Sequence, residues 1–98
     1  KKAISLLQQV VKKDTNHVRA YLQLGNILRK ENTDQAIKIH QSLTVRPNLN
    51  SDQKVQIHKA LAKDYLEIGY TKNAIEEAKK ILLIEKRNLW SLKFMIKT

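Results

Sequence analysis

The stretch AIKIHQSLTVRPNLN, residues 36–50, carries the pattern that decides the fold. Apolar residues and one histidine recur there at steps of three and four, which is the spacing of one face of an α-helix. Pro47 has no amide hydrogen and disfavours helical backbone at the preceding residue, so we expect this helix to end at Arg46. The positions on the helix face are Ala36, Ile37, His40 and Leu43.

The same spacing recurs along the rest of the chain and predicts an all-α fold. We expect residues 1–14 to be the second helix of a repeat and residues 88–98 to be the first helix of another. Between these two helices, we expect one full repeat in residues 16–46 and another in residues 50–86. The connections are short, so neighbouring helices should form antiparallel hairpins.

Polar residues stand at the breaks between these helices, where a side-chain oxygen can accept from the free amides of a new helix. Gly69 can adopt the left-handed backbone that closes a helix. The expected N-caps are Thr15 or Asn16, Thr33, Asn50 or Ser51, Thr71, and Asn88.

Small residues recur at equivalent positions and indicate an internal repeat. Ala3, Ala36 and Ala74 are 33 and 38 residues apart, close to the 34-residue period of tetratricopeptide repeats. Gly25 and Ala62 occupy matching small positions on the first helices of two hairpins. Small residues let helix backbones approach closely, and stacked hairpins bury the faces that one hairpin leaves open. We therefore predict a right-handed tetratricopeptide-type superhelix.

The pattern departs from the tetratricopeptide consensus at several large positions. The usual tryptophan of the first helix is Tyr21 or His58, and the usual aromatic residue of the second is Leu7, His40 or Ala78. A straight helical bundle is the structural alternative.

Four segments resemble a more specific family. LGNILRK, DQAIKIHQSLTVRPNL, LAKDYLEIG and NAIEEA are similar to the repeat domain of bacterial lipopolysaccharide assembly protein B, over residues 24–78. Glu31 and Asn32 stand where that family usually has glycine. The resemblance implies an adaptor that helps a membrane-bound protease degrade the deacetylase committing precursor to lipid A. It also implies a cytoplasmic location at the inner membrane, an N-terminal membrane helix, and a C-terminal module with iron-type metal on paired cysteines.

Composition sets limits on the function. The chain of 98 residues has a net charge of +10 and no cysteine, which removes thiolate nucleophiles and cysteine metal sites from this segment. No stretch is long and apolar enough to span a bilayer. The charge suits an acidic protein, nucleic acid or anionic lipid, or it reflects a simple bias in composition. Aromatic content of 5% and the lack of a stacking platform make nucleic acid the less favoured partner.

Groups that could carry out catalysis are few. His17, His40 and His58 do not have the spacing of paired metal ligands on one helix. We expect His40 to be a buried structural residue rather than a ligand or base, and His58 to pack as well. Glu76 and Glu77 are adjacent and diverge on a helix, so they should pair with neighbouring lysines on a solvated face. The sequence therefore predicts no enzyme and no cofactor in this segment.

The first helices of the hairpins should line the concave side of the array. Seven of the twelve residues expected there are basic and one is acidic, which predicts a wall that binds an acidic protein segment, with Asn26 bonding to its backbone. A merely solvated basic surface is the alternative. Assembly through Leu92, Met95 and Ile96, or their burial by a further repeat, is a separate possibility. The twelve residues are Arg19, Leu22, Asn26, Arg29, Lys30, Gln56, Lys59, Lys63, Glu67, Trp90, Lys93 and Lys97.

Overall fold

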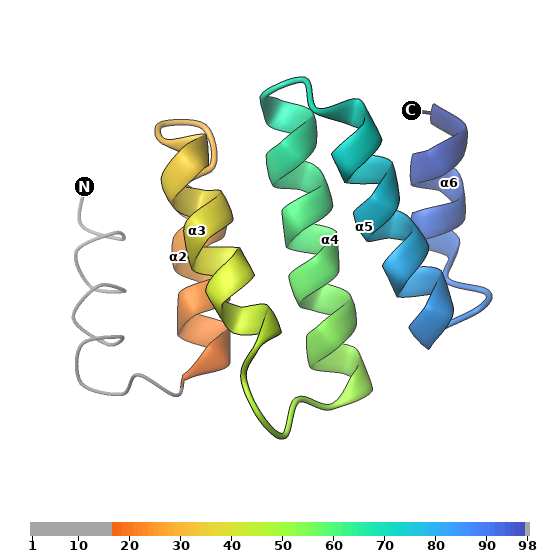
Figure 1. Cartoon of the computed structure of the whole chain (residues 1–98), viewed down its shortest axis with the longest axis horizontal. Coiled ribbons are helices and arrows are strands. Elements are labelled where there is room, and N and C mark those ends of the chain that lie inside the picture. The colour runs from red at the N-terminus through yellow and green to blue at the C-terminus, as the bar shows by residue number, and fades with distance from the viewer. Residues whose placement is uncertain (1–16, 98) are drawn as a thin grey trace.

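The computed structural model describes residues 17–97, and all of their regular structure is helical, as predicted. The helix expected within residues 1–14 lies outside the described residues. The helices are α2 (Val18–Leu28), α3 (Thr33–Thr44), α4 (Ser51–Glu67), α5 (Thr71–Ile84) and α6 (Leu89–Lys97). Each helix packs against the next one along the chain. Figure 1 shows that successive helices alternate in direction, with α2 behind α3 in this view, so that neighbouring helices form antiparallel hairpins.

Two of the predicted N-caps are confirmed. The Asn50 side chain accepts from the Gln53 amide at 2.8 Å, and the Gln53 side chain accepts from the Asn50 amide at 2.9 Å. This reciprocal capping box satisfies two backbone donors at the start of α4. Asn88 accepts from the Ser91 amide at 2.9 Å at the start of α6. Gly69 has the predicted left-handed backbone, with φ of 79°.

Other boundaries differ from the prediction by one or two residues. Asn32, not Thr33, caps α3, because its side chain accepts from the Gln35 amide. Tyr70 precedes α5 and makes no side-chain cap, so the prediction of Thr71 is wrong. At the start of α2, the cap is His17, whose ring nitrogen accepts from the amide of Ala20 at 3.0 Å.

Helix α3 ends at Thr44 rather than at the predicted Arg46. The Arg46 amide bonds to the Leu43 carbonyl at 3.2 Å, which tightens the chain into a turn before Pro47 is reached. Asn48 then takes a left-handed backbone with φ of 63°. The proline therefore follows a helix that has already ended.

The small residues do lie at the close contacts between helices. Ala36, Ala62 and Ala74 are fully buried, and Gly25 is buried on α2. A Cβ atom added to Gly25 would lie 2.7 and 2.8 Å from two carbons of the His40 ring. The close approach at this point is therefore between the α2 backbone and a side chain of α3.

Larger apolar residues fill the space between the first two hairpins. Leu43, Ile57 and Leu61 form a buried cluster against which Tyr21 and Ile37 pack. At the other end of the array, several large apolar side chains remain exposed. Leu83 and Ile96 are each 84% exposed, and Leu89 is 69% exposed.

Candidate partner-binding wall

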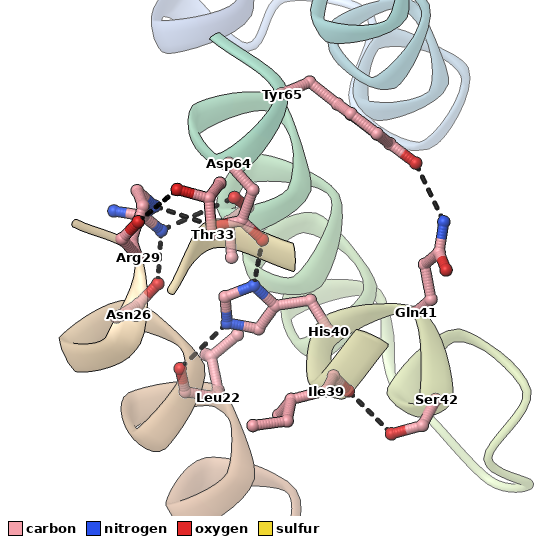
Figure 2. Close-up of polar contacts among 11 residues, drawn as sticks. Leu22, Asn26, Arg29, Thr33, Ile39, His40, Gln41, Ser42, Asp64 and Tyr65 are labelled. Atoms are coloured by element: carbon pink, nitrogen blue, oxygen red, sulfur yellow. Dashed lines mark hydrogen bonds and ion pairs between the residues drawn. The ribbon is translucent and has the colours of Figure 1, made fainter. Parts of the chain in front are cut away.

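A buried polar network joins the first three described helices behind the wall. His40 and Asp64, on α3 and α4, are fully buried and bond to each other through Nδ1 and Oδ2. His40 Nε2 lies 3.0 Å from the Leu22 carbonyl of α2, and Arg29 Nε donates to Asp64 Oδ1 at 2.7 Å. Figure 2 shows the His40 ring between Leu22 and Asp64.

The hydrogen-bond partners define what the ring of His40 can do. A carbonyl oxygen only accepts, so the Nε2 atom that faces Leu22 carries a hydrogen. The Nδ1 atom forms a hydrogen bond with the carboxyl group of Asp64. Both ring nitrogens are therefore occupied and shielded from solvent. The prediction that His40 is buried is confirmed, whereas its partner Asp64 was not foreseen.

Arg29 was predicted to face a partner, and the structure gives it internal partners instead. Besides Asp64, its Nη2 atom donates to Asn26 Oδ1 and to the Ala60 carbonyl. The Asn26 side chain keeps its amide hydrogens for another acceptor. The guanidinium of Arg29 thus holds the wall together as well as adding charge to it.

A polar groove of about 570 Å³ lies between α2 and the start of α4. Four of the predicted wall residues line it, which places them together as expected. Asp52 also contributes, so this part of the wall is less basic than the sequence predicts. The complete lining is Val18, Arg19, Leu22, Gln23, Asn26, Asn50, Asp52, Gln53 and Gln56.

A second group of predicted wall residues meets where α4 approaches α6. The ammonium groups of Lys59 and Lys63 lie 5.2 and 6.0 Å from the centre of the Trp90 ring, within cation–π distance. Trp90 also stacks on Phe94, with 4.8 Å between ring centres. We call Lys59, Lys63 and Trp90 the lysine–tryptophan cluster.

The surroundings of this cluster disfavour the positive charge of Lys63. Burial lowers the pKa of Lys63, and the positive charges of Arg29 and Lys59 lower it further. No carboxylate of the described residues lies within ion-pair distance of Lys59 or Lys63. Asp64, on the same helix, is committed to Arg29 and His40. The cluster therefore holds cations without a resident counter-ion.

The remaining predicted wall residues lie outside these two groups. Lys30 follows α2, while Glu67 and Lys93 are exposed on α4 and α6. Lys97 is the last residue of α6.

A separate group of three polar side chains lies where α5 packs against α4. His58 Nδ1 lies 2.8 Å from Glu77 Oε1, and Lys80 donates to Glu77 Oε2 at 3.0 Å. The prediction that Glu77 sits on a solvated face is wrong, because it is 7% exposed; Glu76 is exposed beside Lys79, as expected. Burial alone would raise the pKa of Glu77, but the hydrogen bonds and charges of His58 and Lys80 hold it below its ordinary value.

Within residues 17–97, no three acidic, histidine or cysteine side chains gather as they would to hold a metal ion. No helix in that range has the length and apolar character to cross a membrane. Antiparallel hairpins with a polar groove and a basic cluster on their first helices define an all-α helical-repeat protein.

Comparison with known proteins gives a more specific relationship. The chain is 38% identical over 69 residues to lipopolysaccharide assembly protein B of Escherichia coli strains K12, CFT073 and O157:H7. The aligned stretch is 69% of this chain and 18% of the relative, so the chain spans less than a fifth of the length of the proteins it matches. This identity shows a relationship to lipopolysaccharide assembly protein B. No family model and no solved structure matches the chain.

Proposed function

We propose that this chain is a non-catalytic, protein-binding part of a regulator of lipopolysaccharide assembly. In this proposal it acts as an adaptor that brings a deacetylase of the lipid A pathway to a membrane-bound protease at the inner membrane. The wall formed by α2, α4 and α6 binds an acidic segment of one of these partners.

The observation that carries the proposal is the unpaired charge on the wall. Lys59 and Lys63 lie over one aromatic ring, and no carboxylate of the described residues lies within ion-pair distance of either ammonium group. A protein segment that supplies carboxylates there would form charge-assisted hydrogen bonds, which are about twice as strong as neutral ones. The adjoining groove presents Asn26 and Gln56, whose amides suit the backbone of an extended segment. The relationship to lipopolysaccharide assembly protein B supports the pathway.

The test compares charge reversal on the wall with the same reversal elsewhere. The wall variant carries Lys59→Glu, Lys63→Glu and Lys93→Glu. We would measure binding of the purified deacetylase and of the protease's cytoplasmic domain by calorimetry at several salt concentrations. Wild-type binding to one of them should weaken as salt rises, and the wall variant should lose it.

A matched control keeps the change in net charge constant. Lys38, Lys72 and Lys79 are exposed on the second helices α3 and α5, and their reversal to glutamate should preserve binding. Circular dichroism would establish that both variants fold. If both variants weakened partner binding equally, the effect would come from overall charge, and the wall would be rejected as the binding surface. Binding that is unchanged in both variants would likewise reject the wall, whereas a wild-type chain that binds neither partner would reject the adaptor proposal.

A further inference from the structure

The lysine–tryptophan cluster has a geometry that lysines on a solvated surface do not need. Flexible lysines usually extend into water, away from other cations. Here two ammonium groups from adjacent turns of α4 converge on the one ring of Trp90, with Arg29 close enough to disfavour further positive charge. An anion at this point would relieve that repulsion and accept hydrogen bonds from both ammonium groups.

We propose that the lysine–tryptophan cluster is an anchor for two glutamate side chains at alternate positions of an extended protein segment. This inference rests on the proposed function and specifies which part of the wall selects the acidic segment. Lys59 and Lys63 each bind one carboxylate, while the Trp90 ring packs against the glutamate methylenes.

The spacing along α4 selects alternate rather than adjacent carboxylates. Lys59 and Lys63 are four residues apart on a helix, which corresponds to a rise of about 6 Å. In an extended chain, side chains two residues apart point to the same side and are separated by about 6.6 Å. Adjacent side chains point to opposite sides, so only one of two adjacent glutamates could reach the cluster. The residue between the alternate glutamates faces away from the wall.

The one tryptophan of the chain provides the readout, because a ligand at the cluster changes the surroundings of Trp90. The ligands are seven-residue peptides with blocked termini, so that only side-chain carboxylates are offered. One peptide has glutamates at its third and fifth positions, and its isomer has them at the third and fourth. Both would be titrated into the chain at low salt, with Trp90 fluorescence and calorimetry followed in parallel.

We expect the alternate peptide to bind about tenfold more tightly than its isomer, as the loss of one charge-assisted contact implies. Lys59→Met with Lys63→Met should abolish this difference and weaken the alternate peptide about 100-fold, since two such contacts are lost. The control, Lys72→Met with Lys79→Met, removes the same charge from α5 and should leave the preference unchanged.

Each other outcome rejects a defined part of the reasoning. Equal affinity for the two peptides, or a preference that survives the Lys59 and Lys63 substitutions, would overturn the anchor while leaving an acidic-segment wall in place. Failure of every acidic peptide and of both partner proteins to bind would overturn the proposed function itself. A single-stranded oligonucleotide that binds more tightly than the alternate peptide, through the same two lysines, would also overturn the anchor as a protein site.

Discussion

Substitution of Gly25 by alanine tests the contact between α2 and α3 most directly. The ring of His40 lies against the Gly25 backbone, and a new Cβ atom would sit 2.7 and 2.8 Å from two ring carbons and still closer to Nε2. Real Cβ atoms do not approach that closely, so the ring must move. His40 cannot move without lengthening its bonds to Asp64 and to the Leu22 carbonyl, because both its nitrogens are occupied.

The expected magnitude follows from opposing terms. Alanine in place of glycine within a helix stabilises by about 1 kcal/mol. Overpacking a full core costs about 1–3 kcal/mol, and a buried polar group left without its hydrogen bond costs about 1–3 kcal/mol more. We therefore expect Gly25→Ala to lower the free energy of unfolding by about 1–5 kcal/mol, a large part of the stability of a small domain.

Urea denaturation followed by circular dichroism would measure this loss, and a second background isolates its cause. In a His40→Ala chain the ring is absent, so adding Gly25→Ala should stabilise by about 1 kcal/mol. The sign of the Gly25 substitution should thus reverse between the two backgrounds. The steric explanation would be refuted if Gly25→Ala were neutral or stabilising in the wild type. It would also be refuted if the substitution changed the free energy of unfolding in the same direction in both backgrounds.

Two further predictions concern a helix cap and an ion pair. Asn50→Ala removes the capping box of α4 and should lower the free energy of unfolding, measured by urea denaturation, by about 1 kcal/mol. The control is Asn73→Ala, at an exposed position of α5, which should change the free energy of unfolding by less than about 0.5 kcal/mol. Equal effects of the two substitutions would argue against the cap. Because the pKa of Glu77 is lowered on folding, its ionised form stabilises the fold above the ordinary pKa of about 4.3, and this contribution is lost as pH falls through the lower folded pKa. Stability should therefore fall less steeply below about pH 4.3 in Glu77→Gln than in the wild type. Parallel stability profiles would contradict the assignment.

Most of the architecture could be predicted because helices are encoded by local spacing. Periodicity located all five described helices, and Ala36, Ala62 and Ala74 proved to be fully buried contact points. The errors concern helix boundaries, and some of them fall where two residues that could cap a helix are adjacent. Asn32 and Thr33 both suit an N-cap, and only the backbone path decides which side chain faces the free amides.

The polar contacts were harder to foresee because their partners are distant in the sequence. His40 and Asp64 are 24 residues apart, and no spacing rule connects a helix of one hairpin with a helix of the next. The signal available was that both lie in the segments that resemble lipopolysaccharide assembly protein B. Glu77 was misjudged for a related reason: the sequence shows its lysine neighbour, but not that the His58 side chain of α4 lies against it.

The wall itself was partly predictable. Helical geometry correctly grouped Arg19, Leu22, Asn26 and Gln56, which line one groove. Nothing in the pattern could indicate that lysines from α4 would converge on the ring of Trp90, because that depends on how closely α6 approaches.

The exposed apolar side chains near α6 have a consequence for how the chain behaves in concentrated solution. Leu83 and Ile96 are each 84% exposed on a molecule whose net charge is +10. At an ionic strength of about 0.1 M, like charges repel over about 10 Å, which keeps these side chains of different molecules apart. At about 1 M the range shrinks to about 3 Å, and the apolar contacts then act unopposed. The colloidal stability of the chain is therefore set by the salt in its buffer.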